Sequence, residues 1–336
     1  MVQDNINLII QNAINSKKYN DIKKENELIA NLKKAILENY TLFETTNKID
    51  LSNNNGFVLE KNTMETIIDR YINAIPLINS KDNSTITEND LLISNIYSNL
   101  GIVHVIFDGN TYTMLEMILL GLLTHNTVIF AYDKFMCGTN GLLISIIESI
   151  LEKQNYKKEM FQHVINYKIE KIFDNFKTID KTILIGNNDF NTKYLKLCST
   201  NVITSGYKNY DIYIEDITHI DIINKILNTK NNINLYINSN LKVKSNNAIL
   251  VNDIEEAVTQ INYNGSKYSS SIFTTNNENA SYFIKNISSK NIMVNASPTL
   301  EQQLDITQYD LLIEKTIIMP NIYKFDGNRI NIDLNN

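Results

Sequence analysis

The chain has 336 residues and a mass of 38.6 kDa, which corresponds to about two domains of ordinary size. Hydrophobic residues make up 43% and charged residues 20%, so a wholly disordered or collagen-like chain is excluded. The net charge is -6 and basic residues are interspersed with acidic ones, a pattern that argues against a nucleic-acid groove. We expect a globular protein without a nucleic-acid partner.

Residues 21–40 and 62–75 carry apolar residues at helical spacing and are predicted to be packing helices. Residues 85–99 mix polar and β-branched residues and are predicted to form a short hairpin. The N-terminus has no basic segment followed by an apolar core, and the apolar run at 114–123 is too short to cross a bilayer. We therefore expect a cytoplasmic protein without a membrane partner.

The pattern changes at residue 101, where short apolar strands begin to alternate with helices. The first predicted set comprises strands at 101–107, 126–132, 182–186 and 201–204, with helices at 112–123, 138–153 and 190–198. The second comprises strands at 211–214, 248–251, 270–274 and 291–294, with helices at 218–227, 253–263 and 277–287. Apolar strands that alternate with helices predict an α/β fold with parallel sheets.

In an open parallel sheet, the ligand crevice lies at the carboxyl ends of the strands. The loops to inspect are residues 108–111, 133–140, 186–189 and 205–209. None contains a glycine-rich phosphate-binding motif. Gly186 and Asn187 could begin a phosphate cradle, or an ordinary turn between a strand and a helix.

Two segments of the first set resemble the start of the cofactor domain in the aldehyde dehydrogenase superfamily. Residues 100–110 read LGIVHVIFDGN and residues 119–129 read LLGLLTHNTVI. Further segments resemble γ-glutamyl phosphate reductases, also called glutamate-5-semialdehyde dehydrogenases, in the same order along the chain: 210–221 (YDIYIEDITHID), 253–265, 269–283 and 291–297. The likeness covers most of the chain.

The resemblance implies a Rossmann-like aldehyde dehydrogenase fold with a cofactor domain, a catalytic domain and a β-ribbon used in oligomerisation. We expect a helical N-terminal region and cofactor-type domain at 1–206, and a reduced catalytic-type domain at 207–294. A C-terminal segment at 295–336 follows, in which residues 307–329 either form the intersubunit ribbon or a strand within the same subunit. Members of the family bind NAD or NADP and use a cysteine nucleophile.

The nucleophilic cysteine that the resemblance implies is absent from the corresponding part of this sequence. Residues 230–237, which stand where the family carries it, read KNNINLYI. Cys198 falls near the end of a predicted helix, where a cysteine is usually inert packing. Cys137 falls near a helix start, where a thiol can have a lowered pKa, and is the one weak catalytic candidate. Two cysteines and four scattered histidines also predict no metal site.

Other departures concern the cofactor. Ala131 and Tyr132 stand where the family often has a lysine for the adenosine ribose. Asn110 stands where the family's oxyanion asparagine can lie, although an ordinary turn residue is the alternative. If a cofactor crevice survives, Asn110, Gly186 and Asn187 are the residues predicted to line it, and NAD or NADP is the expected ligand; otherwise no cofactor is expected.

Three hypotheses follow for the function. The first is a non-catalytic relative, a pseudoenzyme that acts as a scaffold or homo-oligomeric, partner-binding subunit. The second is a divergent NAD(P)-dependent oxidoreductase that acts on an aldehyde or acyl phosphate. The third is a module that binds a nucleotide or metabolite without turnover. The acidic groups at 215–221 and 255–256 are interpreted as helix caps and solvated faces.

Overall fold

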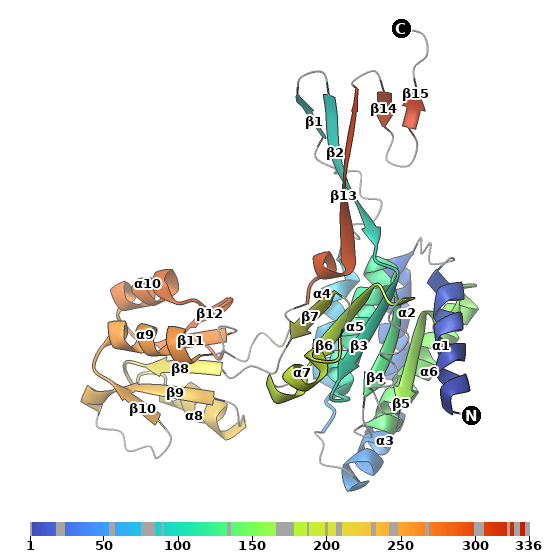
Figure 1. Ribbon diagram of the computed structural model, residues 1–336. Helices are drawn as coiled ribbons and strands as arrows, with labels where there is room; N and C mark the ends of the chain where they lie inside the picture. Colours follow the sequence, from blue (N-terminus) through green and yellow to red (C-terminus); the bar gives the residue numbers. More distant parts are fainter. Residues whose placement is uncertain are drawn as a thin grey trace. The chain divides into compact units, whose positions relative to one another are not determined.

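The computed structural model describes residues 2–17, 24–53, 58–74, 85–88, 91–132, 136–165, 178–186, 188–198, 201–205, 210–229, 233–241, 248–265, 269–298, 306–320, 323–325 and 330–332. The chain divides into two compact units. Unit 1 comprises residues 1–206 and 304–336, and unit 2 comprises residues 207–303. Each unit has its own parallel sheet (Figure 1).

The sheet of unit 1 has five parallel strands in the order β5-β4-β3-β6-β7. These strands are β3 (Ile102–Phe107), β4 (Thr127–Tyr132), β5 (Phe161–Ile165), β6 (Lys181–Ile185) and β7 (Val202–Ser205). β3, β4 and β6 are buried along their whole length, because helices cover both faces of the sheet. This burial explains their continuous apolar sequences.

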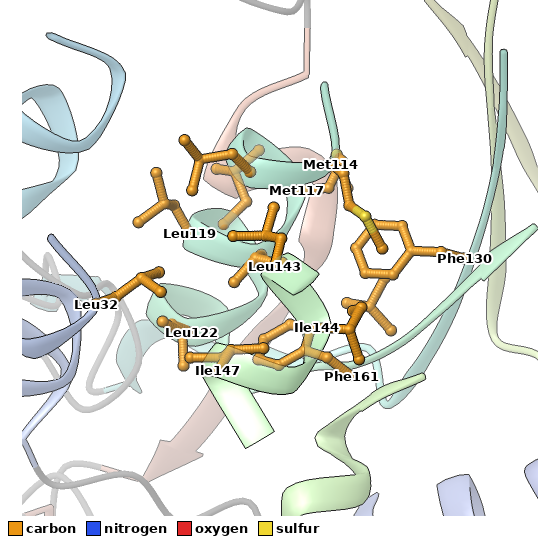
Figure 2. Close-up of a cluster of buried hydrophobic side chains, with 14 of the residues drawn as sticks. Leu32, Met114, Met117, Leu119, Leu122, Phe130, Leu143, Ile144, Ile147 and Phe161 are labelled. Atoms are coloured by element: carbon orange, nitrogen blue, oxygen red, sulfur yellow. The ribbon is translucent and has the colours of Figure 1, made fainter. Parts of the chain in front are cut away.

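The helices of unit 1 are α1 (Val2–Lys17), α2 (Glu25–Glu38), α3 (Tyr40–Asn53), α4 (Lys61–Ile72), α5 (Thr111–Thr124), α6 (Cys137–Lys153) and α7 (Asn188–Leu195). Side chains of α2, α4, α5 and α6 pack on one face of the sheet and form the larger core. Figure 2 shows part of this core, with Leu32, Met117 and Leu143 from three helices and Phe130 and Phe161 from the strands. Side chains of α1 and α7 belong to the core on the other face.

Unit 2 has a second five-stranded parallel sheet in the order β10-β9-β8-β11-β12. Its strands are β8 (Tyr210–Ile214), β9 (Ile233–Asn238), β10 (Ala248–Val251), β11 (Ser269–Phe273) and β12 (Asn291–Val294). One face packs against α8 (Ile220–Thr229), and the other against α9 (Ile254–Asn264) and α10 (Asn277–Asn286). The predicted α/β class with parallel sheets is therefore confirmed in both units.

A three-stranded antiparallel sheet, the ribbon, extends from the helices of unit 1 (Figure 1). It comprises β1 (Thr85–Glu88), β2 (Leu91–Asn99) and β13 (Leu312–Pro320), in the order β1-β2-β13. The predicted hairpin at 85–99 is confirmed as β1 and β2. β13 pairs with β2 of the same chain over its whole length, and pairing with another subunit stays a prediction.

η4 (Gln308–Leu311), a short 3-10 helix before β13, connects the ribbon to the sheet of unit 1 through hydrogen bonds. The Lys181 ammonium donates to the Asp310 carbonyl at 2.7 Å, and the Asn126 amide donates to the Leu311 carbonyl at 2.8 Å. A two-stranded sheet of β14 (Tyr323–Phe325) and β15 (Ile330–Ile332) follows β13. Among the described helices, none is both long and apolar enough to cross a membrane.

Candidate functional site

The predicted cofactor loops of unit 1 lie next to each other at the carboxyl edge of its sheet. Phe107 at the end of β3 pairs with Ile185 at the end of β6. Chain order reverses between these two strands, which is where open α/β sheets bind ligands. Asn110 follows β3 and Gly186 follows β6, so the fold brings these two candidates to one edge, whereas Asn187 lies outside the described residues.

Asn110 is the N-cap of α5. Its side-chain oxygen accepts a hydrogen bond from the Tyr112 backbone N–H at 2.9 Å, and its own N–H donates to the Asp108 carboxylate at 3.0 Å. Gly109 has a φ of +96°, which glycine adopts without strain. The turn therefore accounts for the Asp-Gly-Asn sequence. An oxyanion role would use the amide NH2 group of Asn110, which this cap does not consume.

Gly186 is enclosed by the first turn of α7. Its N–H donates to the Ser205 carbonyl at 3.1 Å, and its carbonyl accepts from the Asn191 amide at 3.1 Å. A Cβ atom at Gly186 would lie 2.4 Å from the Phe190 ring. Phosphate cradles use unpaired backbone N–H groups, but this N–H is already bonded. The geometry is that of a closed turn between strand and helix, and it does not fit a phosphate group at Gly186.

The N-terminus of α6 holds a carboxylate from within the chain. Asp50 of α3 accepts hydrogen bonds from the Gly138 N–H at 3.1 Å, the Thr139 N–H at 2.8 Å and the Thr139 hydroxyl at 2.6 Å. Asp50 lies 88 residues before Gly138 in the chain. The partial positive charge of a helix N-terminus favours a nearby anion, and the Asp50 carboxylate supplies that anion here.

Cys137 is the first residue of α6 and is half-buried, so it lies beside the Asp50 carboxylate site. The helix N-terminus was the reason to consider Cys137 as a nucleophile, because it favours a thiolate. A carboxylate already bonded there opposes a second negative charge at the same place. The local geometry therefore weakens the case for Cys137.

Buried and part-buried polar contacts lie near the carboxyl ends of β3 and β4. The Asn140 amide donates to the Gly109 carbonyl at 2.7 Å and accepts from the Thr111 hydroxyl at 2.8 Å. The Tyr132 hydroxyl and His163 Nδ1 are 2.9 Å apart. Burial raises the pKa of Tyr132, and the nearby Cys137 adds to that rise, while burial lowers the pKa of His163. Both rings are therefore neutral at pH 7, and Tyr132 offers no cation for a ribose or phosphate.

Cys198 lies beyond the end of α7, which stops at Leu195 rather than at the predicted residue 198. Burial raises the pKa of its thiol to about 11. At neutral pH the group is a thiol, and a thiol is a poor nucleophile. The structure gives it a packing role beside the smaller core of unit 1.

The acidic groups of unit 2 cap and tie its loops, in agreement with the sequence interpretation. Glu215 accepts hydrogen bonds from Thr274 and Asn279. Asp216 accepts from the Thr218 N–H at 3.0 Å and from the Thr275 hydroxyl at 2.9 Å. Although burial opposes its charge, these hydrogen bonds hold the pKa of Asp216 below its ordinary value. Among the described residues, no group of three or more His, Cys, Asp or Glu side chains could hold a metal.

Sequence reasoning missed Asp50, Asn140, His163 and Phe190, which build this edge of unit 1. Asn140 lies in the loop at residues 133–140, which the predicted fold places at the ligand edge of the sheet. The sequence could therefore have identified it as a candidate site residue. Asp50 and Phe190 gave no such signal, because their partners depend on how helices return to the sheet.

Several solved structures share this fold. A γ-glutamyl phosphate reductase from Thermotoga maritima superimposes with a TM-score of 0.72 at 14% identity, over 94% of this chain and 98% of that one. A glyceraldehyde-3-phosphate dehydrogenase from Methanocaldococcus jannaschii, solved with NADP, gives 0.73 at 12% identity, over 95% of both chains. The chain has the aldehyde dehydrogenase fold.

A betaine aldehyde dehydrogenase from Staphylococcus aureus, solved with NAD+, supports the same fold with a TM-score of 0.74 at 10% identity, over 98% of this chain and 92% of that one. The sequence matches no protein-family model and no curated protein. The resemblance to aldehyde dehydrogenases is therefore confirmed by the fold, and their chemistry has to be judged from the residues present.

Proposed function

We propose that the protein is a non-catalytic member of the aldehyde dehydrogenase fold that acts as an assembly subunit. The observation that carries this proposal is the placement of its two cysteines. Both belong to unit 1, Cys137 beside the Asp50 carboxylate and Cys198 with a raised pKa, and residues 230–237 of unit 2 contain none. Thiolate attack on an aldehyde or acyl phosphate has no suitable group in these places.

The cofactor loop supports the same proposal. At Gly186 the backbone N–H is bonded to Ser205, and the Phe190 ring packs against the glycine. Tyr132, which stands where a ribose-binding lysine is common in the family, is buried and neutral. These residues do not fit a dinucleotide phosphate at this loop, so we derive no chemical step through NAD or NADP.

The ribbon supports assembly as the remaining role. β13 is an edge strand of the ribbon, and in the described chain it pairs only with β2. Its Ile313 and Ile318 side chains are 41% and 62% exposed on opposite faces of the sheet. An exposed edge strand with apolar side chains is a surface for strand pairing. We propose a second copy of the chain as the partner.

Two measurements test this proposal. Melting temperature and NADH fluorescence are followed while NADH or NADPH is titrated to millimolar concentration, and sedimentation is run at several protein concentrations. A ligand at 100 times its dissociation constant stabilises a fold by about 2.7 kcal/mol, so binding would be visible as a higher melting temperature. We expect no shift and a stable oligomer; a cofactor-dependent shift or a strict monomer would contradict the proposal.

A second candidate function is an NAD(P)-dependent oxidoreductase of the γ-glutamyl phosphate reductase or aldehyde dehydrogenase type. The likeness to a relative solved with NADP favours it, as does the NH2 group of Asn110 at the sheet edge. It requires Cys137 as the nucleophile. Turnover of γ-glutamyl phosphate or of aldehydes that disappears in Cys137→Ser, and not in Cys198→Ser, would establish this function instead.

A further inference from the structure

β11 of unit 2 is a buried strand that begins with three hydroxyl side chains, Ser269, Ser270 and Ser271. A strand covered on both faces ordinarily carries apolar residues. A buried hydroxyl group needs a hydrogen-bond partner, so each serine indicates a polar group beside the strand. Ser270 bonds the Ser289 hydroxyl at 2.5 Å. Ser269 and Ser271 instead bond backbone carbonyls of the segment that follows β12.

The segment after β12 folds back over β11. Asn295 has a φ of +53°, a left-handed conformation in which asparagine is enriched, and the chain turns back from there. The Ser271 hydroxyl donates to the Ala296 carbonyl at 2.6 Å, and the Ser269 hydroxyl donates to the Pro298 carbonyl at 2.7 Å. The segment therefore runs in the direction opposite to β11. We call its four residues, from Asn295 to Pro298, the strap.

Asn295 holds the start of the strap to the end of β11. Its side-chain oxygen accepts from the Thr274 N–H and its NH2 group donates to the Thr274 carbonyl, both at 2.9 Å. Its own N–H donates to the Ile272 carbonyl at 2.8 Å. The two ends of the strap are thus held mainly by side chains, Asn295 at one end and Ser269 at the other, and not by a ladder between strands.

The strap is a small element that can open without unfolding the sheet. Fixing the backbone of four residues costs conformational entropy, and each hydrogen bond that holds them contributes a modest net free energy. These opposing contributions are of similar size, so opening the strap requires far less free energy than unfolding unit 2. β11 keeps its ladders with β8 and β12 when the strap opens, because these ladders do not involve the strap.

We propose that the strap is a latch, which opens as one unit and thereby changes the length of chain that joins unit 2 to unit 1. The chain leaves the described part of unit 2 at Pro298 and next enters that of unit 1 at Ile306. Opening adds the four strap residues to this connection and extends its reach by up to about 14 Å. The inference goes beyond the assembly function and does not depend on it.

A longer connection widens the range of motion between the units. The other connection, from Ser205 to Tyr210, keeps its length when the strap opens. With the latch closed, two connections of fixed length limit the motion of unit 2. With the latch open, one of these limits is relaxed.

Hydrogen exchange of the full chain tests whether the latch opens as one unit. Ser269→Ala together with Ser271→Ala removes both hydroxyl donors, and the Thr274 N–H, which bonds only the far end of the strap, should then exchange about tenfold faster or more. Ser270→Ala is the matched control, because its hydroxyl bonds outside the strap, and should leave that rate unchanged. An unchanged rate in the double variant, or equal acceleration in the control, overturns the latch.

Single-molecule energy transfer tests the change in reach, with dyes at Lys34→Cys in unit 1 and Tyr263→Cys in unit 2 on a background with Cys137→Ser and Cys198→Ser. Both labelled positions are exposed, at 73% for the Lys34 side chain and 87% for Tyr263. Opening the latch should broaden the distribution of distances between the dyes, because the connection is longer.

Asn295→Gly is a second way to open the latch, which keeps the test decisive if the double serine variant does not fold. Glycine adopts the same left-handed backbone, and the substitution removes only the side-chain bonds to Thr274. We expect a broadened distribution in Asn295→Gly and in the double serine variant, and the wild-type width in Ser270→Ala. Faster exchange with an unchanged distribution, or a distribution broadened equally by Ser270→Ala, overturns the proposed change in length.

Discussion

At the scale of single residues, the most informative side chain is the Asp50 carboxylate. It bonds two backbone N–H groups and a hydroxyl at the start of α6, where an anionic ligand or a reactive thiolate would otherwise be favoured. Together with the raised pKa of Cys198, it is the basis for the proposal that neither sulfur of this chain acts as a nucleophile. The contact also joins α3 to α6, so it stabilises the fold.

Removing that charge should therefore cost stability. We expect Asp50→Asn to lower the free energy of unfolding by about 2 kcal/mol, because a charge-assisted bond to a helix N-terminus is lost. Glu44→Gln is the matched control: Glu44 lies on the same helix in an exposed i,i+4 pair with Lys48, and such pairs contribute little. Urea denaturation of both variants measures the difference, and equal small losses would contradict the capping role.

The thiol of Cys198 should be slow to react. With a pKa of about 11, its thiolate fraction at pH 8 is about two hundredfold lower than that of an ordinary cysteine. Alkylation by iodoacetamide, followed by mass in the Cys137→Ser variant, should be correspondingly slow and should accelerate as the pH rises toward 11. A rate at pH 8 equal to that of a free cysteine would contradict a buried Cys198 thiol with a raised pKa.

At the scale of elements, α7 decides the state of the candidate cofactor edge. Phe190 packs against Gly186 and its ring lies 4.8 Å from that of Tyr194, while Asn191 bonds the carbonyls of Gly186 and Ser205. α7 thus lies between β6 and β7 along the chain, and its first turn packs against the loop that follows β6.

This packing predicts a coupled pair of substitutions. Gly186→Ala should destabilise the protein by about 2 kcal/mol, because its Cβ would lie 2.4 Å from the Phe190 ring. Adding Phe190→Ala should relieve the clash, so the double variant should be more stable than the sum of the two single losses by about 1 kcal/mol. Gly141→Ala is the control, since its Cβ would be 3.8 Å from His163 in ordinary contact.

Thermal and urea unfolding of the four variants measures this coupling. We expect Gly141→Ala to be neutral or slightly stabilising, because alanine is favoured over glycine within a helix such as α6. Additive losses for Gly186→Ala and Phe190→Ala would mean that the ring does not enclose the glycine.

Elements with a strong apolar pattern could be predicted from the sequence. β3, β4 and α5 are buried almost throughout, so their sequences carry the signal of their environment. α3 was missed because its buried positions are Phe43, Asn47 and Asp50, of which two are polar. β5 was missed because Gln162 and His163 interrupt its five residues. Polar burial depends on partners elsewhere in the chain, and a local pattern does not contain them.

The candidate site could be predicted to the level of its loops. Strand order placed Asn110 and Gly186 at one edge, because the carboxyl ends of parallel strands meet there. The sequence could not give the contacts that close this edge: Asp50 reaches Gly138 across 88 residues, and Phe190 folds back over Gly186. Both depend on tertiary packing.

At the scale of the whole molecule, the protein has the aldehyde dehydrogenase fold, and the proposed function is that this fold serves assembly without catalysis. Its two parallel sheets and its ribbon reproduce the architecture of solved relatives at 10–14% identity. The fold is kept because its cores are kept, whereas a catalytic site depends on a few residues that can be lost without unfolding the chain.

The central claim is that neither sulfur attacks a carbonyl. Intact-protein mass spectrometry tests it after incubation with an aldehyde panel or with γ-glutamyl phosphate, with and without NAD or NADP, followed by acid quenching, which preserves a thioester on cysteine. The account predicts an unchanged mass for the wild-type chain, identical to that of the variant with Cys137→Ser and Cys198→Ser. A substrate-derived mass increase on the wild-type chain that Cys137→Ser removes would contradict it.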